Sequence, residues 1–548
     1  MNPTNPLDEA LASQISPLCY DVFALQDHTD LDLDALYITK RFSKKVLDRA
    51  LESHTSLSYD DVLIRPGHAD FNLGEVDLTT RFSKKVSLKI PIVSAAMDTV
   101  TEYQMAIAIA IEGGLGIIHR NMTPEKQAHQ VRKVKRHLNG LIDNPEWVDG
   151  EETLNEIRVR FANKYGGLRY HSFPILNDES RLIGILGEKS FRYGDQNKTA
   201  QQAALEQMET GNRGEGVQET TIREAYKIMN EKRIGSLPLT DKEGKLNGMY
   251  VFSDVERIIT GAGTYNTDDK EQLIVGAAIG VHEDAERRLE QLVEANVDVV
   301  VIDSSHGDSE NVIETLKKIK SQSKYNHIDV VVGNVSVGES VERLVDAGAD
   351  GIKVGQGPGS ICTTRVVAGA GRGQMIAIYD CARKARGYGI PLCADGGIVY
   401  SGDITKAIAG GADSVMLGGL LAGVEESPGE TILLNGRQWK TYRGMGSLGA
   451  MQQHESSRQR YGINSPLKLV PEGVEGLEPY KGKLAEVIFQ HTGGLRAGMG
   501  YAGARTIKDL KEGGDFDRLT TSSLRESHPH DLIITKEAPN YRSKNNPE

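Results

Sequence analysis

The chain has 548 residues, of which 39% are hydrophobic and 26% charged, with a formal net charge of -12. This composition is typical of a globular protein with one large core or two domains. The absence of any run of about 18 uncharged apolar residues argues against a membrane span. The acidic balance argues against a dedicated nucleic-acid surface, and we expect short basic clusters such as residues 132–136 (RKVKR) to be solvated helix faces.

The N-terminal residues 1–50 have no pattern that assigns them a role. They begin with an acidic segment and lack a basic stretch followed by an apolar one, so we see no secretory signal and expect a cytoplasmic protein. No C-x-x-C pair is present, which argues against a disulfide framework or a structural zinc site. We expect reduced thiols at the four cysteines, Cys19, Cys362, Cys381 and Cys393.

Eight short apolar runs, each ending in glycine or small polar residues, predict the strands of the core. Several are almost continuously apolar, as strands buried on both faces must be. Segments with helical spacing, such as residues 283–297, lie between many of them. Eight alternating units predict a (β/α)₈ TIM barrel, whose active face lies at the carboxyl ends of the strands. The eight runs are residues 90–97, 114–120, 273–280, 297–307, 328–336, 351–360, 390–397 and 414–422.

An insertion of about 150 residues separates the second and third runs, where a barrel normally has about twenty to thirty. It contains two similar segments, in which Pro174 aligns with Pro238 and Gly184 with Gly248 at the same offset. This tandem module resembles a pair of CBS domains, which often bind adenine or guanine nucleotides, so ATP and GTP are its candidate ligands. The alternative is a structural or oligomerising insert without a ligand. We assign the CBS-domain pair to residues 137–260 and the barrel to residues 51–136 and 261–548.

The glycine-rich loop GQGPGSICTTR, residues 355–365, contains the first candidate for chemistry. A cysteine in such a loop is either packing filler or a nucleophile. Here the glycines allow tight turns, and Ser360 and Thr364 add hydroxyls suited to phosphate or water. We therefore favour Cys362 as a nucleophile and expect Cys381 and Cys393 to be core residues.

Two more glycine clusters, at residues 395–398 and 418–419, end the last two predicted strands. In a barrel, the loops after strands seven and eight frequently form a phosphate site. Asp395 can accept hydrogen bonds from ribose hydroxyls. The three loops together predict a site for a nucleoside monophosphate.

Several motifs along the chain, taken in their order, resemble those of the inosine-5′-monophosphate dehydrogenase family. They include SYDDVLIRPG at residues 58–67, GPGSICTTRVVAGAG at 357–371, YRGMGSLGAM at 442–451 and GGLRAGMGYAGA at 493–504. The resemblance implies oxidation of IMP to XMP by NAD⁺, the committed step of guanine nucleotide synthesis. It implies that Cys362 attacks C2 of the base, that hydride passes to the nicotinamide, and that water hydrolyses the resulting thioimidate.

The same resemblance assigns ligand contacts residue by residue. For Asp303 the alternative role is capping of the next helix. The implied NAD contacts are Asp303, Ser304, Ser305, Asn334 and Gly355. The implied IMP contacts are Ser360, Asp395, Gly397, Gly418, Gly419, Tyr442, Met445, Gly446 and Glu472.

A long polar segment at about residues 450–480 is a candidate mobile flap. Arg460 and Tyr461 match a family pair that enters the vacated dinucleotide site, where the arginine activates water. An unperturbed arginine is a poor base because its pKa exceeds about 12. The alternative proton route is Thr364 with Glu472.

The resemblance also implies a potassium ion and a homo-oligomer, usually a tetramer. The ion would be held by backbone carbonyls of Gly357, Gly359 and Cys362 and of a neighbouring subunit's Glu526, Ser527 and His528.

Gln356 departs from the family pattern, since an apolar residue is usual there.

Two alternative functions compete with the dehydrogenase. GMP reductase shares the barrel and the cysteine loop, but it usually lacks both the insert and the flap pair. The second alternative is a catalytically inactive nucleotide-sensing protein. The presence of Cys362, Asp303, Arg460 and Tyr461 argues against it.

Overall fold

The structure is a computed structural model. It describes residues 43–137, 141–142, 145–165, 172–208, 216–217, 220–261, 264–463, 468–536 and 538–541. Cys19 and most of the predicted N-terminal extension lie outside these residues. Helix α4 (Lys45–Glu52) contacts α16 (Gln374–Gly387), and the backbone N–H of Lys44 donates to the Tyr379 hydroxyl at 2.9 Å. The last residues of the predicted extension therefore pack against the barrel.

All eight predicted strands form, and they close into one parallel barrel, which confirms the predicted fold class. Every strand residue except Asp395, the last residue of β17, is buried, as the continuous apolar runs predict. The strands are β4 (Ile92–Ser94), β5 (Leu115–Ile118), β13 (Val275–Ile279), β14 (Val299–Asp303), β15 (Asp329–Val335), β16 (Gly351–Val354), β17 (Leu392–Asp395) and β18 (Ser414–Leu417).

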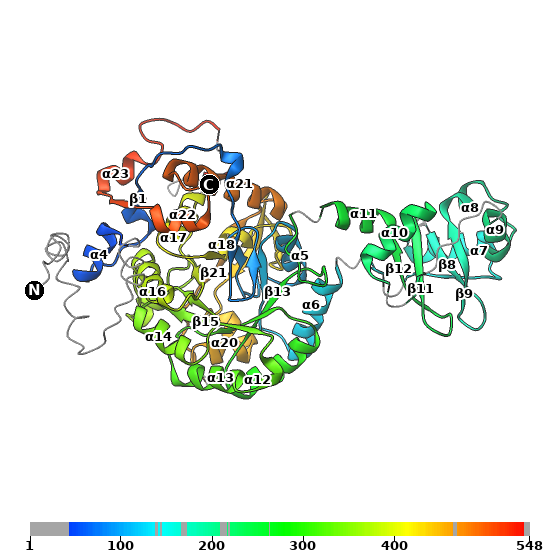
Figure 1. Cartoon of the computed structure of the whole chain (residues 1–548), viewed down its shortest axis with the longest axis horizontal. Helices are drawn as coiled ribbons and strands as arrows, with labels where there is room; N and C mark the ends of the chain where they lie inside the picture. The colour runs from blue at the N-terminus through cyan, green and yellow to red at the C-terminus, as the bar shows by residue number, and fades with distance from the viewer. Residues whose placement is uncertain are drawn as a thin grey trace, which may run out of the picture. The chain divides into compact units, whose positions relative to one another are not determined.

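Helices surround the barrel strands, as Figure 1 shows for α12, α13, α14 and α16. Helix α14 illustrates why they form, because its spacing buries Val341 and Leu344 on one face and exposes Glu339 and Arg343 on the other. The helices that follow the barrel strands are α5 (Tyr103–Ile111), α6 (Pro124–His137), α12 (His282–Glu294), α13 (Glu310–Lys320), α14 (Gly338–Asp346), α15 (Thr364–Val367), α16, α17 (Ser401–Ala409) and α18 (Gly419–Ala422).

Further elements flank the barrel. A three-stranded antiparallel sheet follows β18, and its strands have the order β19, β20, β21. Strand β1 pairs with β22, and β2 pairs with β3. These elements are β1 (Val62–Ile64), β2 (Thr80–Arg81), β3 (Ser87–Leu88), β19 (Thr431–Leu434), β20 (Arg437–Arg443), α19 (Leu448–Gln453), α20 (Glu455–Arg460), β21 (Glu475–Pro479), α21 (Leu484–Ala502), α22 (Ile507–Gly513), β22 (Phe516–Arg518) and α23 (Thr521–Glu526).

The basic cluster at the end of α6 is not a fully solvated face, contrary to our expectation. The side chain of Lys135 is only 3% exposed and its ammonium lies 2.9 Å from Asp268 and 2.6 Å from Asp298. A buried lysine needs such partners because an unpaired charge is costly away from water. Lys135 therefore fastens α6 to the barrel.

The two similar segments of the insert have the same fold. Each contains a helix followed by two antiparallel strands, and the register repeats, since Pro174 pairs with Ile185 as Pro238 pairs with Met249. Strands β6 (Leu141–Ile142), β7 (Val148–Asp149) and β10 (Gly216–Val217) extend these sheets. The two segments are α7 (Leu154–Tyr165), β8 (Ser172–Leu176), β9 (Leu182–Gly187), α8 (Glu188–Tyr193) and α9 (Ala200–Met208), then α10 (Ile222–Lys232), β11 (Ser236–Thr240), β12 (Leu246–Val251) and α11 (Phe252–Gly261).

Equivalent residues of the two repeats touch each other. The hydroxyls of Ser172 and Ser236 lie 2.5 Å apart, and Arg181 forms an antiparallel bridge with Lys245. Contacts between equivalent positions place an approximate twofold axis between the repeats. The insert is thus a tandem module with internal symmetry.

Across the part of the chain that the structure describes, no helix is long and apolar enough to cross a membrane.

Candidate active site

A cavity of about 1220 Å³ opens at the carboxyl ends of the barrel strands. It brings together most of the residues predicted for catalysis and ligand binding. Five predicted residues do not line it: Ser304, Gly446, Glu526, Ser527 and His528. Those that do are Asp303, Ser305, Asn334, Gly355, Gly357, Gly359, Ser360, Cys362, Thr364, Asp395, Gly397, Gly418, Gly419, Tyr442, Met445, Arg460, Tyr461 and Glu472.

The cysteine loop follows β16 and is held by backbone contacts. At Gly355 the backbone has a φ of 147°, and a Cβ there would lie 2.1 Å from the backbone oxygen of Asp395, so only glycine fits. On its other side the loop pairs with residues 472–474. The N–H of Thr363 donates to the backbone oxygen of Glu472 at 3.0 Å, and the N–H of Val474 donates to the backbone oxygen of Ile361 at 3.0 Å. The backbone on both sides of Cys362 is therefore fixed.

The Cys362 thiol is the accessible thiol among the described cysteines. It is half-buried, lies 3.2 Å from the Thr364 hydroxyl and borders the cavity. Cys381 and Cys393 are buried, and burial raises the pKa of Cys393 to about 12 and that of Cys381 well above its usual range. Both therefore stay protonated and inert, as expected for core residues.

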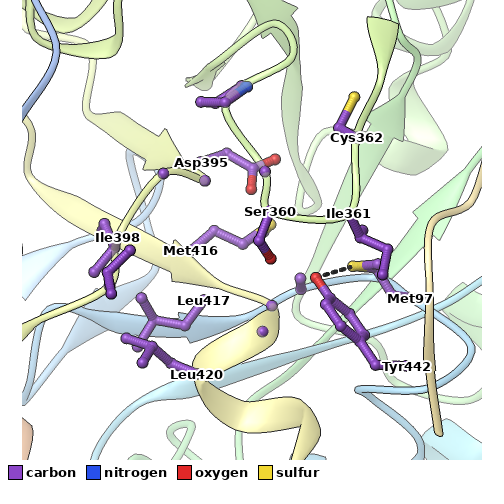
Figure 2. Close-up of a pocket in the computed structure, with 18 of the residues that line it drawn as sticks. Met97, Ser360, Ile361, Cys362, Asp395, Ile398, Met416, Leu417, Leu420 and Tyr442 are labelled. Carbon is purple, nitrogen blue, oxygen red and sulfur yellow. Dashed lines mark hydrogen bonds between the residues drawn. The ribbon is translucent and has the colours of Figure 1, made fainter. Parts of the chain in front are cut away.

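The three glycine-containing loops converge at one end of the cavity. Figure 2 shows Ser360, Asp395 and Tyr442 around the same space. A Cβ on Gly419 would lie 3.2 Å from the Ser360 hydroxyl oxygen, and one on Gly418 would lie 3.0 Å from the Tyr442 hydroxyl oxygen. Two hydroxyls thus face glycine backbone, an arrangement that suits a phosphate group.

A buried lysine that sequence reasoning missed connects the predicted IMP and NAD residues. Lys353, in the centre of β16, is 2% exposed, and its ammonium lies 2.6 Å from Asp395 and 3.2 Å from Asp303. It also donates to Asn334, whose own amide donates to Asp395 at 2.9 Å. The signal in the sequence was a charged residue within an otherwise apolar strand, which must have buried partners.

Asp303 does not cap the following helix, so the capping alternative is wrong. Helix α13 has Ser309 as its N-cap residue. Asp303 is 3% exposed and forms an ion pair with Arg460 of the predicted flap. The Ser305 hydroxyl also donates to the backbone oxygen of Arg460 at 2.9 Å. Arg460 therefore bonds to two residues predicted to bind the dinucleotide, Asp303 and Ser305.

The flap contains helices α19 and α20, and residues 464–467 within it lie outside the described residues. Arg460, at the end of α20, is 14% exposed, and Tyr461 follows it into the cavity. The Tyr461 ring covers Gly446, where a Cβ would lie 2.6 Å from the ring. Both predicted flap residues are thus at the site.

Two influences on Arg460 oppose each other. Burial lowers the pKa of its guanidinium, which favours the neutral form needed by a base, while the adjacent Tyr461 opposes that shift. The ion pair with Asp303 favours the charged form. Thr364 and Glu472, the predicted alternative proton route, also line the cavity beside Cys362.

Gln356 departs from the family pattern, but its side chain has polar partners in this chain. Its carbonyl oxygen accepts from the Ser336 hydroxyl at 2.5 Å, and its nitrogen lies 3.0 Å from Nδ1 of His306. A polar side chain is therefore accommodated where an apolar one is usual.

The predicted potassium ligands do not meet within one chain. The carbonyl of Gly359 lies in the cysteine loop and accepts from the N–H of Cys362 at 3.0 Å. His528 instead packs against Tyr400 and Tyr541, with Nδ1 3.1 Å from the Tyr541 hydroxyl. The described residues contain no cluster of three or more His, Cys, Asp or Glu side chains suited to a metal.

Comparison with known proteins identifies the family. Residues 56–530 match the family described as "IMP dehydrogenase / GMP reductase domain". The inosine-5′-monophosphate dehydrogenase of Halalkalibacterium halodurans is 49% identical over 458 residues, which cover 83% of this chain and 92% of that protein. The enzyme of the same name from Aquifex aeolicus is 49% identical over 461 residues, covering 83% and 91%.

A solved structure of a GMP reductase is also similar to this chain. The crystal structure of a cysteine-to-alanine variant of GMP reductase from Trypanosoma brucei, in complex with guanosine 5′-monophosphate, has 39% sequence identity and a TM-score of 0.76. The match covers 88% of this chain and 100% of that chain. The barrel segments alone make up a smaller share of this chain, so the match extends into the insert. The insert therefore does not by itself separate a dehydrogenase from a reductase. The chain belongs to the IMP dehydrogenase / GMP reductase family of enzymes.

Proposed function

We propose that this enzyme oxidises IMP to XMP with NAD⁺ and water, releasing NADH and a proton. The observation that carries the proposal is the presence of Cys362, Asp303 and Arg460 in one cavity. A nucleophile, a dinucleotide contact and a group for the hydrolytic step are all needed for this reaction. The relatives at 49% identity named inosine-5′-monophosphate dehydrogenase support it.

In the first step the Cys362 thiolate adds to C2 of the purine, and hydride leaves C2 for the nicotinamide ring. This forms NADH and a cysteine thioimidate. The nucleotide would be held with its phosphate against Ser360, Tyr442 and the backbone of Gly397, Gly418 and Gly419. Asp395 would accept hydrogen bonds from the ribose, while Met445, Gly446 and Glu472 would border the base.

In the second step water adds to C2 of the thioimidate and the thiolate leaves, which releases XMP. The NAD contacts proposed for the first step are Asp303, Ser304, Ser305, Asn334 and Gly355. Arg460 lies on two of them, Asp303 and Ser305, so the dinucleotide and the closed flap exclude each other. NADH must leave before Arg460 and Tyr461 reach the thioimidate. Thr364 with Glu472 stays the alternative proton route.

The remaining assignments are part of the same proposal. A potassium ion would be held by the carbonyls of Gly357, Gly359 and Cys362. Glu526, Ser527 and His528, which do not line the cavity of their own chain, would complete the ion site of a neighbouring subunit in a homotetramer. The insert would be a CBS-domain pair that binds ATP or GTP at the cleft between its repeats, and the enzyme would work in the cytoplasm.

The rival activity is GMP reductase, which removes the purine amino group with a reduced nicotinamide cofactor. The decisive assay mixes the purified protein with IMP and NAD⁺, follows NADH by its absorbance and identifies XMP. We expect NADH and XMP in equal amounts. Consumption of a reduced cofactor with GMP, together with release of ammonia, would overturn the proposal in favour of the reductase. Nucleotide binding without turnover in either direction would indicate a sensing protein.

A further inference from the structure

Asn121 is a buried polar residue to which the proposed reaction gives no role. It lies just after β5, at the carboxyl end of the second barrel strand, and is 4% exposed. Its side chain makes hydrogen bonds on both the flap side and the barrel side. A buried amide that satisfies partners on two separate segments fixes their relative position.

On the flap side, Asn121 bonds to two serines of α20. The Ser456 hydroxyl donates to Oδ1 of Asn121 at 2.6 Å, and the Ser457 hydroxyl lies 3.2 Å from the same oxygen and 3.0 Å from Nδ2. Ser457 is fully buried. Helix α20 ends at Arg460, so these bonds hold the helix that presents the arginine to Asp303.

On the barrel side, Asn121 bonds to an ion pair. Its Nδ2 donates to Asp98 at 2.8 Å, and Asp98 accepts from Arg443 at 2.7 Å. Asp98 follows β4 and its side chain is only 7% exposed. Arg443 ends β20, two residues before Met445, which lines the cavity. The network therefore connects α20 to the ends of β4 and β20 at the active face.

Two other polar side chains of α20, unlike that of Arg460, bond within the flap itself. Arg458 donates to the backbone oxygen of Met451 at 2.5 Å, and Gln459 donates to Glu455 at 3.1 Å. These bonds move with the flap and cannot hold it closed. Asn121 is different because its bonds to Ser456 and Ser457 must break when α20 leaves the barrel.

We propose that Asn121 is a positioning residue that holds the flap closed while Arg460 acts in the hydrolytic step. This inference rests on the proposed function, in which flap and dinucleotide compete for Asp303 and Ser305. Loss of Asn121 favours the open flap, so hydrolysis slows while the dinucleotide binds more tightly. The two effects have opposite signs, whereas general damage to the fold would weaken both catalysis and binding.

The test compares Asn121→Ala with Ser456→Ala, which removes one bond from the flap side, and with the control Gln459→Ala. Loss of buried hydrogen bonds is expected to shift the flap equilibrium by about tenfold in Asn121→Ala and by less in Ser456→Ala. We expect kcat to fall about tenfold, the pre-steady-state burst of NADH to remain, and the inhibition constant of NADH to decrease. Gln459→Ala should behave like the wild type.

Hydrogen exchange of the α20 peptide gives a readout that does not depend on activity. Its amides should exchange faster in Asn121→Ala and Ser456→Ala than in the wild type or in Gln459→Ala. The inference is overturned if exchange is unchanged, or if the NADH burst and dinucleotide affinity fall together with kcat. Absence of NADH formation by the wild type would instead refute the proposed function, and the exchange comparison would still decide whether Asn121 holds the flap.

Discussion

The loop that carries Cys362 and the flap that carries Arg460 both border the cavity, but different interactions hold them. Backbone hydrogen bonds to residues 472–474, which lie in the predicted flap segment but outside α20, and a close approach at Gly355 fix the cysteine loop. The flap helix α20 is held by side chains, through the Arg460 ion pair and the bonds of Ser456 and Ser457 to Asn121.

This difference matches what each step of the proposed reaction needs. The nucleophile takes part in both steps, so its position must not change between them. In the proposed reaction Arg460 acts only after NADH has left, and Arg460 pairs with Asp303, which is a proposed dinucleotide contact. Side-chain contacts can break and re-form without disturbing the barrel, so they suit a segment that opens in every cycle.

The largest effect is expected for Cys362→Ser, which changes the nucleophile but not the loop. A hydroxyl is a far weaker nucleophile than a thiolate, so turnover should fall by about 10⁴-fold or more while IMP binding remains measurable. Mass spectrometry of wild-type enzyme quenched during turnover should find a nucleotide adduct on Cys362. An adduct on Cys381 or Cys393, or normal activity of the serine variant, would contradict the assignment.

Arg460→Ala removes the flap's contact with Asp303 and should separate the two chemical steps. Hydride transfer should continue, since the arginine is absent from that step, and hydrolysis should slow by about 10²-fold, as for loss of a positioned base. Rapid mixing should show a burst of NADH close to one per active site, followed by a slow steady rate. If the burst disappears, or if the steady rate is unchanged, Thr364 with Glu472 becomes the better account of water activation.

Two glycines test whether the cysteine loop is more rigid than the flap. Gly355 and Gly462 both have positive φ, but a Cβ on Gly355 would lie 2.1 Å from backbone whereas one on Gly462 meets nothing within 4 Å. Gly355→Ala should lower the free energy of unfolding by about 2–3 kcal/mol, because backbone strain and overpacking add. Gly462→Ala should cost about 1 kcal/mol from backbone strain alone. Chemical denaturation of the two variants measures the difference, and equal costs would argue against a rigid loop.

The smallest effect on turnover is expected from replacing the insert, residues 137–260, by a short flexible linker. Both the cysteine loop and the flap lie outside it, so the rate should change by less than about twofold, while any response to ATP or GTP should vanish. Titration of both nucleotides against the full-length and shortened enzymes measures this. Loss of the fold or of all activity would show that the insert is not a separable module.

The sequence alone determined those features that depend on short-range patterns. The eight apolar runs predicted all eight strands, because a strand buried on both faces must be apolar along its length. Pro174 and Pro238 are separated by the same offset as Gly184 and Gly248, and this revealed the repeat, since equivalent residues in a duplicated fold keep their spacing. The glycines around Cys362 marked its loop, because only glycine tolerates such turns.

The tertiary structure alone decided which distant side chains meet. Lys353 joins Asp303 to Asp395, and Asn121 bonds to serines more than three hundred positions away, contacts that no local pattern encodes. The same holds for Asp303, which a sequence reading could take for a helix cap but which pairs with Arg460. The physical reason is that a closed barrel brings the ends of all its strands to one face, so partners there are chosen by geometry and by the cost of leaving buried charges unpaired rather than by separation along the chain.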